Sequence, residues 1–426
     1  MNKLKLLFLE IVLFPYSFSI AQDKTESKFG IKFGGYVSTD VFMDTRINNS
    51  APREGYFFLI PSNKSLDNAG NDVNKKNNFN ILSIQTRLNG KISGPDVLNA
   101  KTSAFIESEF FGHTDADING LRLRHAYAKF NWSKTELMIG QYWHPMFVAD
   151  VSPSTLSFNT GAPIQPFSRN PQLRVTQKIF NGLSVIGVLS SERDFSSYGP
   201  TSNIDPKAIT SSLYLRNSGL PMAHLQFQYR PDSTEHVFGA GVDYKSIVPY
   251  TNISVKKKIY KSDATVNSIS ALAFMKLKFK PVIIKLEAVY AQNAYDLTML
   301  GGYAVKKIDS VNGNISYTNS LTAAYWVDVQ SNTKKIQVGV FAGHSRNYGY
   351  KNNAIPNLPV YTRGGDIKYL YRFAPRITYI TGSINISAEV EYTLASYGTT
   401  DLTNGKVIYN SDVANTRYII GLLYNF

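Results

Sequence analysis

Apolar and polar residues alternate along most of the chain after Phe29, with a period of two instead of 3.6. In segment 384–394, isoleucine, alanine, valine, tyrosine and leucine share one face, while polar residues and two glutamates share the other. Segments 321–330 and 418–426 repeat this pattern. A period of two is typical of β-strands, and runs of about ten residues exceed the five or six of an average strand. About ten residues cross a bilayer as a tilted strand.

The connections between these strands alternate between short and long. Short turns are expected near 93–95, 131–134, 181–182, 231–234, 280–281, 331–334 and 381–383. Long polar segments are expected near 45–78, 112–118, 142–171, 191–221, 246–265, 293–319, 345–364 and 396–414. Seven short turns and eight long loops join 16 strands, with both termini on the short-turn side. The sequence therefore predicts an all-β fold, a closed transmembrane antiparallel β-barrel with short periplasmic turns and long extracellular loops.

A secreted β-sandwich or propeller is the competing interpretation of the same alternation. Its strands should be shorter, and its apolar faces need not end in aromatic residues. Here tyrosine and phenylalanine repeatedly close the apolar face, as at Tyr369, Tyr371, Phe373, Tyr424 and Phe426. Aromatic residues at both membrane interfaces are typical of outer-membrane barrels. The pattern therefore favours the barrel and a location in the bacterial outer membrane.

Residues 1–21 have the pattern of a secretory signal peptide. Lys3 and Lys5 precede an apolar stretch, and small residues stand at positions 19 and 21, where a signal peptidase would cleave. A buried N-terminal helix is the alternative. We expect residues 22–426 to be exported and to form one barrel domain, since no later apolar run reaches the roughly 18 residues of a membrane helix.

The composition of the chain excludes several kinds of functional site and partner. The chain has 45 Lys plus Arg against 31 Asp plus Glu and a formal net charge of +14, and it contains no cysteine. The absence of cysteine excludes disulfide scaffolds, thiolate catalysis and zinc–thiolate sites. Because the charges are dispersed, we expect no nucleic-acid partner. The basic excess instead favours anionic partners such as small solutes. The run Lys256, Lys257 and Lys258 is interpreted as a solvated strand end, with contact to lipopolysaccharide as the alternative.

If the apolar residues face lipid, the alternate residues line a lumen. On the second strand this rule places Ile84 and Leu88 on the lipid side. The candidate lumen residues are Arg87, Arg122, Arg124, Arg174, Arg372, Glu107 and Glu109. Unpaired arginines in a narrow section would favour anions and suit carboxylates. Arginines neutralised by neighbouring glutamates would only fill the lumen, and the residues alone leave both interpretations open.

The segment 142–172 is the predicted constriction loop. It contains five prolines, together with Asp150 and Arg169. Proline fixes φ and cannot donate to a strand ladder, so the segment is stiff and cannot be a strand. We expect it to fold inward and narrow the pore, with Arg169 near the path of a solute. A position outside, on the cell surface, is the alternative.

The last strand ends with Gly421, Tyr424 and a C-terminal Phe426. This ending resembles the terminal signal that the outer-membrane barrel assembly machinery recognises. The resemblance implies that this machinery is a partner of the chain. An ordinary aromatic-rich strand is the alternative.

Four segments in the first half resemble the DcaP-type outer-membrane porins. They are FGGYVSTDVF (33–42), FIESEFFG (105–112), LRLRHAYAKF (121–130) and GQYWHPMF (140–147). The resemblance covers about residues 29–174 and implies a trimeric, sixteen-stranded diffusion porin that favours small anionic solutes such as dicarboxylates. It also implies that Arg122 and Arg124 form a basic constriction facing Glu107 and Glu109. Some members carry an N-terminal helical extension, whereas only residues 22–28 precede the first strand here, so a trimer would rest on contacts of the barrel wall.

We expect no enzyme, no cofactor and no strong metal site. The six histidines lack metal-helix spacing, and the chain has neither a nucleophile elbow nor a phosphate-binding loop. Asp115, Asp117 and Asn119 copy the first half of a calcium loop, but Ala126 stands where the bidentate glutamate should be. A gated transporter would need a plug and about 22 strands. A rim hydrolase or a surface-binding barrel is the alternative to a diffusion porin.

Overall fold

The computed structural model describes residues 29–48, 56–112, 117–201, 207–255, 257–311 and 313–426. Every structural statement below concerns these residues. The predicted signal peptide, residues 1–21, lies outside them and stays a prediction.

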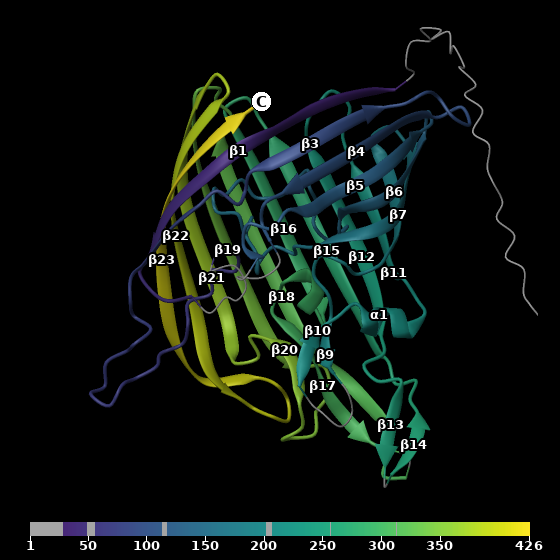
Figure 1. Cartoon of the computed structure of the whole chain (residues 1–426), viewed down its shortest axis with the longest axis vertical. Helices are drawn as coiled ribbons and strands as arrows, with labels where there is room; N and C mark the ends of the chain where they lie inside the picture. Colours follow the sequence, from purple (N-terminus) through teal and green to yellow (C-terminus); the bar gives the residue numbers. More distant parts are fainter. Residues whose placement is uncertain (1–28, 49–55, 113–116, 202–206, 256, 312) are drawn as a thin grey trace, which may run out of the picture.

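Sixteen antiparallel strands form the wall, if β2 and β3 are counted as two parts of one strand. They are β1 (Gly30–Asp44), β2 (Asn78–Leu82) with β3 (Arg87–Ser93), β4 (Lys101–Glu109), β5 (Arg122–Asn131), β6 (Thr135–Trp143), β7 (Arg169–Phe180), β8 (Leu183–Ser190), β11 (Met222–Tyr229), β12 (Val237–Ile247), β15 (Val266–Lys278), β16 (Val282–Gln292), β18 (Ile315–Ser331), β19 (Ile336–Tyr350), β21 (Ile367–Thr381), β22 (Ile384–Thr400) and β23 (Val407–Asn425). β1 pairs with β23 over nine residue pairs, which closes the sheet. The predicted closed barrel is confirmed (Figure 1).

The long loops carry short elements of their own. These are β9 (Tyr198–Pro200), β10 (Ala208–Thr210), α1 (Leu213–Ser218), β13 (Asn252–Val255), β14 (Lys258–Lys261), η2 (Tyr295–Leu297), β17 (Gly301–Ile308) and β20 (Val360–Arg363). β17 pairs with β18 and β20 and so extends the wall at the loop end. No helix in the described ranges is long and apolar enough to span a membrane.

The two ends of the barrel differ as expected. In Figure 1 the short turns and the C-terminus lie at the top, and the long loops lie at the bottom. Two loops are shorter than predicted, because β19 continues to Tyr350, β22 continues to Thr400 and β23 begins at Val407. The polar residues there, such as Ser345 and Asn347, are buried on the inner face of long strands. In these segments, polar residues therefore indicate strand positions that face the lumen and do not indicate a loop.

The outer face of the wall is apolar and exposed. Phe33 is 84% exposed and Ile420 60%, and tyrosines such as Tyr325 and Tyr371 lie among them. Large apolar side chains facing outward around a closed antiparallel barrel can be stable only against lipid. The protein is therefore a multi-pass protein of the bacterial outer membrane.

The lumen is partly filled by apolar residues, which was not expected. One cluster joins the aromatic run Tyr56–Ile60 of the first long loop to Phe158 and Phe167 of the predicted constriction loop. Ile84 belongs to this cluster and is 1% exposed, so its predicted position on the lipid side is wrong. A turn at 83–86 separates β2 from β3, and this break ends the strict alternation on which the prediction depended.

Candidate pore constriction

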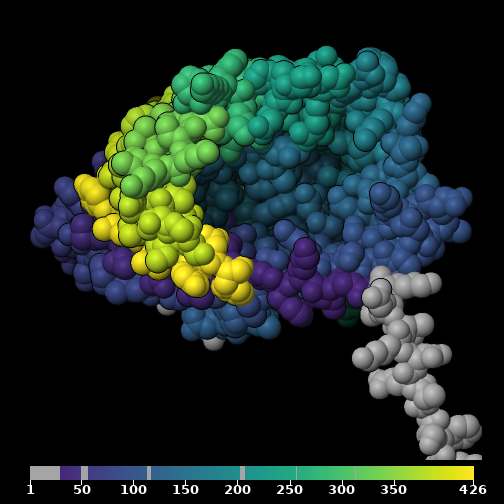
Figure 2. Space-filling view, turned by 90° about the horizontal axis from the view of Figure 1, so that it is seen from above, coloured from purple at the N-terminus to yellow at the C-terminus, as the bar shows by residue number. Residues whose placement is uncertain are grey.

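Loop 3, residues 144–168 between β6 and β7, crosses the lumen to the opposite wall. The backbone nitrogens of Leu156 and Ser157 donate to the Glu389 carboxylate of β22 at 2.9 and 3.1 Å. The side chain of Asn159 donates to Glu391 on the same strand at 3.0 Å. Seen from the short-turn end, the molecule is a ring around a hollow, and blue atoms of the first half of the chain lie across its floor (Figure 2).

Loop 3 also packs against the wall through apolar side chains. Met146, Val151 and Ile164 are at most 1% exposed and form a cluster with inward residues of six strands, including Trp326 and Phe341. The inner wall is apolar at these contacts. This complementarity holds the loop inside the barrel, because exposing the cluster to water would cost the free energy of its burial.

Loop 1, residues 45–77, lies beside loop 3. The guanidinium of Arg372 on β21 donates to the carbonyl oxygens of Ala162 in loop 3 and Phe58 in loop 1, at 2.7 and 2.8 Å. Arg417 on β23 donates to the Tyr56 carbonyl at 3.1 Å. The run of five apolar residues at 56–60 is the sequence signal for this inward fold, although the alternation predicts a long polar loop over 45–78.

The predicted arginines and glutamates of the first half come together in one network around Glu109. Glu109 is fully buried and lies 2.5 Å from Arg122, 3.5 Å from Arg87 and 3.6 Å from Arg169. Its second oxygen accepts a close hydrogen bond from Arg124. One carboxylate is thus surrounded by four guanidinium groups from β3, β5 and β7.

Two more acids complete this network, which we call the arginine network. Glu107 accepts from Arg124 at 2.7 Å. Asp194, in the loop after β8, lies 3.0 Å from Arg122 and 2.8 Å from Arg169. Asp194 was missed by the sequence analysis, because it lies 72 residues from Arg122 with no pattern to connect them. Four arginines therefore face three acids, which leaves a formal excess of one positive charge.

Burial decides which members of the network a solute could touch. The side chains of Arg122 and Arg124 are 2% exposed, and that of Arg169 is not exposed at all. Arg87 is 20% exposed and Glu107 12%. The three buried arginines therefore act mainly as structure, and Arg87 and Glu107 are the members that border open space.

Aromatic rings cover the buried arginines. Arg122 lies 5.2 Å from the ring centre of Phe111, and Arg124 and Arg169 lie 5.5 and 5.1 Å from that of Trp143. Guanidinium groups stack favourably on aromatic faces. Each buried cation thus has a carboxylate on one side and a ring on another.

The remaining predicted arginines differ from each other. Arg372 forms a 2.9 Å ion pair with Glu391, is fully buried and fastens loops 1 and 3, so its predicted place on the solute path is wrong. Arg174 donates to Gln172 and to the Trp143 carbonyl at 3.1 and 3.3 Å. Within the described ranges Arg174 has no acidic group within ion-pair distance.

The C-terminal strand closes the barrel beside this site. The backbones of Phe426 and Gly35 exchange two hydrogen bonds of 3.2 Å, while the rings of Tyr424 and Phe426 are about half exposed outward. Gly421 has a different role, because a Cβ there would lie 2.8 Å from Leu156 and 2.7 Å from Asp40. The lack of a side chain at Gly421 lets the tip of loop 3 approach the wall.

The weak calcium candidate gains no support. Asp115 lies outside the described residues, and the Asp117 carbonyl accepts from the Gly120 nitrogen at 3.1 Å, which makes a turn. Among the residues that the structure covers, no group of three metal-ligating side chains could hold an ion.

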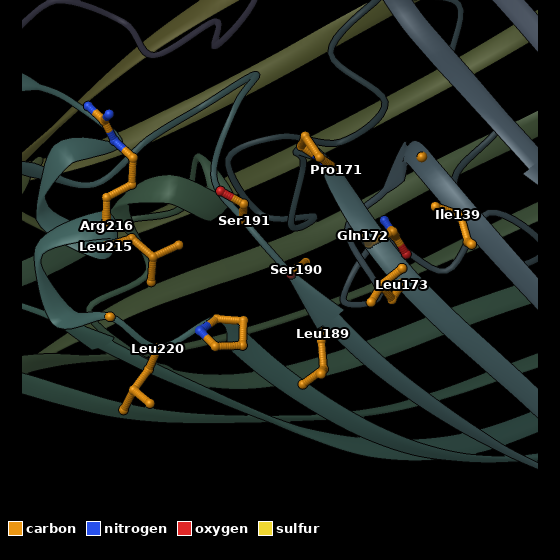
Figure 3. Close-up of a pocket in the computed structure, with 13 residues that line it drawn as sticks. Ile139, Pro171, Gln172, Leu173, Leu189, Ser190, Ser191, Leu215, Arg216 and Leu220 are labelled. Atoms are coloured by element: carbon orange, nitrogen blue, oxygen red, sulfur yellow. The ribbon is translucent and has the colours of Figure 1, made fainter.

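A concave pocket on the outer wall is unrelated to the lumen. It has a volume of about 650 Å³ and lies between helix α1 and strands β6 to β8. Leu215 and Leu220 line one side, and Leu173, Leu189 and Ile139 line the other (Figure 3). Its apolar lining fits a lipid chain or another protein surface and is unsuited to a hydrophilic solute.

The fold of this chain is similar to that of porins of known structure, whereas its sequence is only distantly similar to theirs. No protein-family model and no curated protein sequence matches the chain. The structure of the outer membrane channel DcaP of Acinetobacter baumannii is similar, with a TM-score of 0.66 and 15% identity over 95% of this chain and 99% of that chain. An anion-selective porin from Comamonas acidovorans gives a TM-score of 0.53 and 10% identity, covering 93% of this chain and all of that one. The trimer form of OmpT, an outer membrane protein of Vibrio cholerae, gives 0.53 and 10%, with 94% of this chain and all of that one covered. The chain thus has the fold of an outer-membrane porin and is most like DcaP among these three.

Proposed function

We propose that the protein is a diffusion porin that passes small hydrophilic, preferentially anionic solutes such as dicarboxylates. The observation that carries the proposal is a loop that crosses the lumen of a closed barrel and leaves Arg87 and Glu107 partly exposed at its edge. A loop held inside a barrel narrows its cross-section to the size of small solutes. The porin fold shared with DcaP supports the same function.

The anionic preference follows from the charges near loop 3. The arginine network has an excess of one positive charge, and Arg174 adds a cation without an acidic partner in the described part of the chain. In a narrow, low-dielectric passage a small excess of charge biases which ions enter. The effect is modest, because most of the arginine charge is already neutralised. Dicarboxylates fit this excess, as two carboxylates can contact two cations.

The test is single-channel current in a planar bilayer, with the reversal potential measured under a salt gradient. Stepwise conductance with anion preference supports the proposal. Conductance with cation preference would support the diffusion-porin function and contradict the preference for anionic solutes. If the folded, heat-modifiable barrel carried no current, diffusion would be rejected in favour of the alternative, a rim hydrolase or a surface-binding barrel.

We also propose that the protein is a homotrimer in contact with outer-membrane lipid and lipopolysaccharide, inserted by the barrel assembly machinery. The apolar pocket beside α1 offers a surface for a second copy. Native mass spectrometry of detergent-solubilised protein should give the mass of three chains. A single chain at micromolar concentration would contradict the trimer without affecting the porin.

A further inference from the structure

A set of lysines with no acidic ion-pair partner in the described ranges faces the lumen near the short-turn end of the barrel. These vestibule lysines are Lys32 on β1, Lys91 on β3, Lys101 on β4, Lys178 on β7, Lys276 on β15 and Lys285 on β16. Along its strand, each of these lysines either alternates with residues that face the lipid or lies on the same face as residues that face the lumen. Lys32, for example, stands between Ile31 and Phe33, which are 55% and 84% exposed on the lipid side.

The vestibule lysines are not neutralised by the surrounding wall. Within the described ranges none of them has an acidic group within 4.0 Å. Three acids near this end already have other partners, since Glu136 pairs with Lys129 at 3.0 Å and Glu235 with Lys278 at 2.6 Å. Asp328 is held by Arg376 at 2.8 Å. The vestibule lysines thus differ from the arginine network, whose charges nearly cancel.

Four of the vestibule lysines form two directly opposed pairs on neighbouring strands. Lys32 is the register partner of Lys91, and Lys276 is the register partner of Lys285. Like charges at directly opposed positions of an antiparallel pair destabilise the sheet. The stability of the sheet therefore does not explain two such pairs on the inner face.

The second lysine pair also contacts the constriction loop. The ammonium group of Lys285 donates to the Ser152 carbonyl at 3.0 Å and to the Ser154 hydroxyl at 2.7 Å. An anion held by Lys276 and Lys285 would therefore lie against the start of the crossing segment of loop 3. The Lys276–Lys285 pair therefore lies between the periplasmic mouth of the barrel and the constriction formed by loop 3.

We propose that the vestibule lysines bind small multivalent anions at the periplasmic mouth. The pairs Lys32–Lys91 and Lys276–Lys285 are the two places where two ammonium groups hold one anion. Concave walls of low dielectric focus the field of such charges and raise the local anion concentration. The proposal deepens the porin function and rests on it for the transport role, and it adds a second source of anion selectivity at the periplasmic mouth to that of the charges near loop 3.

The first test is isothermal titration calorimetry of the folded, detergent-solubilised full chain with inorganic pyrophosphate. Wild type should bind it, and the triple variant Lys32→Gln, Lys91→Gln, Lys276→Gln should bind about tenfold more weakly, the loss expected from removing two or three charge contacts near a surface. The control is Lys334→Gln with Lys335→Gln, in a turn where Lys335 lies over the outward ring of Tyr379. It should change the affinity less than twofold. Because the changes relieve like-charge repulsion, the triple variant should keep its heat-modifiable fold.

The second test is block of single-channel current by pyrophosphate added to one side at a time. Block should occur at lower concentration from the periplasmic side, and raising KCl from 0.1 to 1 M should weaken it, since the Debye length falls from about 10 to about 3 Å. A wild type that conducts but binds no pyrophosphate would overturn the vestibule site and leave the porin. A wild type that binds pyrophosphate but carries no current would keep the site and reject the porin. Equal affinity in the triple variant would reject the assignment to these lysines.

Discussion

The ion-pair partners and the burial of each charged side chain in the lumen determine whether it can contact a solute. Arg122 and Arg87 are both inward arginines, yet the first is buried between two acids and a ring while the second keeps a fifth of its side chain exposed. A guanidinium that already donates to two carboxylates has few donors left for a solute. Among the described residues, Arg87, Arg174 and the vestibule lysines therefore keep donors with which to contact a solute.

Replacing Glu109 by glutamine should be strongly destabilising. The change leaves Arg122, Arg124 and Arg169 buried with less negative charge, and breaking a buried ion pair costs about 3–5 kcal/mol. The measurement is the free energy of unfolding in urea. Asp150→Asn is the matched control, because its pair with Arg230 is about half exposed and such pairs contribute about 0–1 kcal/mol. A loss of under 1 kcal/mol in Glu109→Gln would show that the network does not stabilise the barrel.

Glu192, in the loop after β8, should make stability depend on pH. Burial, with the nearby negative Asp296, raises the pKa of Glu192 to about 7 from an ordinary value of 4.5. The folded state therefore holds this proton more tightly, and stability falls as pH rises from about 4.5 through about 7. Glu192→Gln should unfold at a higher temperature than wild type at pH 8 and at a similar one at pH 4. Equal unfolding temperatures at pH 8 would contradict the raised pKa.

At the scale of elements, loop 3 is held by acids of β18 and β22 that accept from its backbone. A loop inside a barrel must find partners for its N–H groups, because an unpaired buried amide is costly. Ser154, Leu156 and Ser157 donate to Asp328 and Glu389 at 2.9–3.3 Å. The wall acids thus replace the strand partners that a proline-rich segment lacks.

Glu389→Ala should loosen loop 3 while leaving the barrel closed. Two backbone N–H groups lose their acceptor, so we expect about 1–3 kcal/mol of local destabilisation per lost group, larger mean conductance and frequent brief current transitions. Single-channel recording measures both. Asp150→Ala, in the same loop but in an exposed ion pair, should leave the current trace unchanged. A quiet trace of unchanged conductance in Glu389→Ala would show that the loop does not depend on this anchor.

At the scale of the whole molecule, the pairing of β1 with β23 turns a sheet into a barrel. The last residue contributes to it, since Phe426 and Gly35 exchange two backbone hydrogen bonds. Closure leaves no strand edge in the bilayer, where each unpaired peptide group would cost several kcal/mol. Closure and apolar outer residues together make the sheet compatible with lipid.

Deleting Phe426 should impair assembly, because it removes both of these hydrogen bonds and the predicted recognition signal. The measurement is the fraction of heat-modifiable protein in the outer membrane, with total periplasmic protein as a reference for export. We expect at least a several-fold loss of the membrane fraction with export unchanged. Phe426→Tyr keeps the backbone and the ring and should assemble normally. Normal insertion of the deletion variant would count against the signal.

The strand pattern was readable in the sequence because a strand in a barrel alternates between lipid and lumen at every residue. The prediction failed where alternation is interrupted or inner residues are apolar. Ile84 follows the break between β2 and β3, and Tyr56–Ile60 lies in a loop that the sequence analysis treated as polar. In both cases the residues belong to an apolar cluster inside the lumen. A pattern that sorts residues only into apolar and polar cannot distinguish such a cluster from a lipid-facing surface.

The all-β class, the 16 strands, the two ends of the barrel and the inward face of Arg122 and Arg124 could be predicted from the amino-acid pattern, because they depend on local alternation and turn spacing. Three relations are visible only in the folded chain: Asp194 and Glu109 neutralise those arginines, Arg372 fastens two loops, and Lys32 and Lys276 each face another lysine. These relations depend on strand register and on loops that meet across the lumen. Register joins residues far apart in the chain, and no local pattern in one sequence records it.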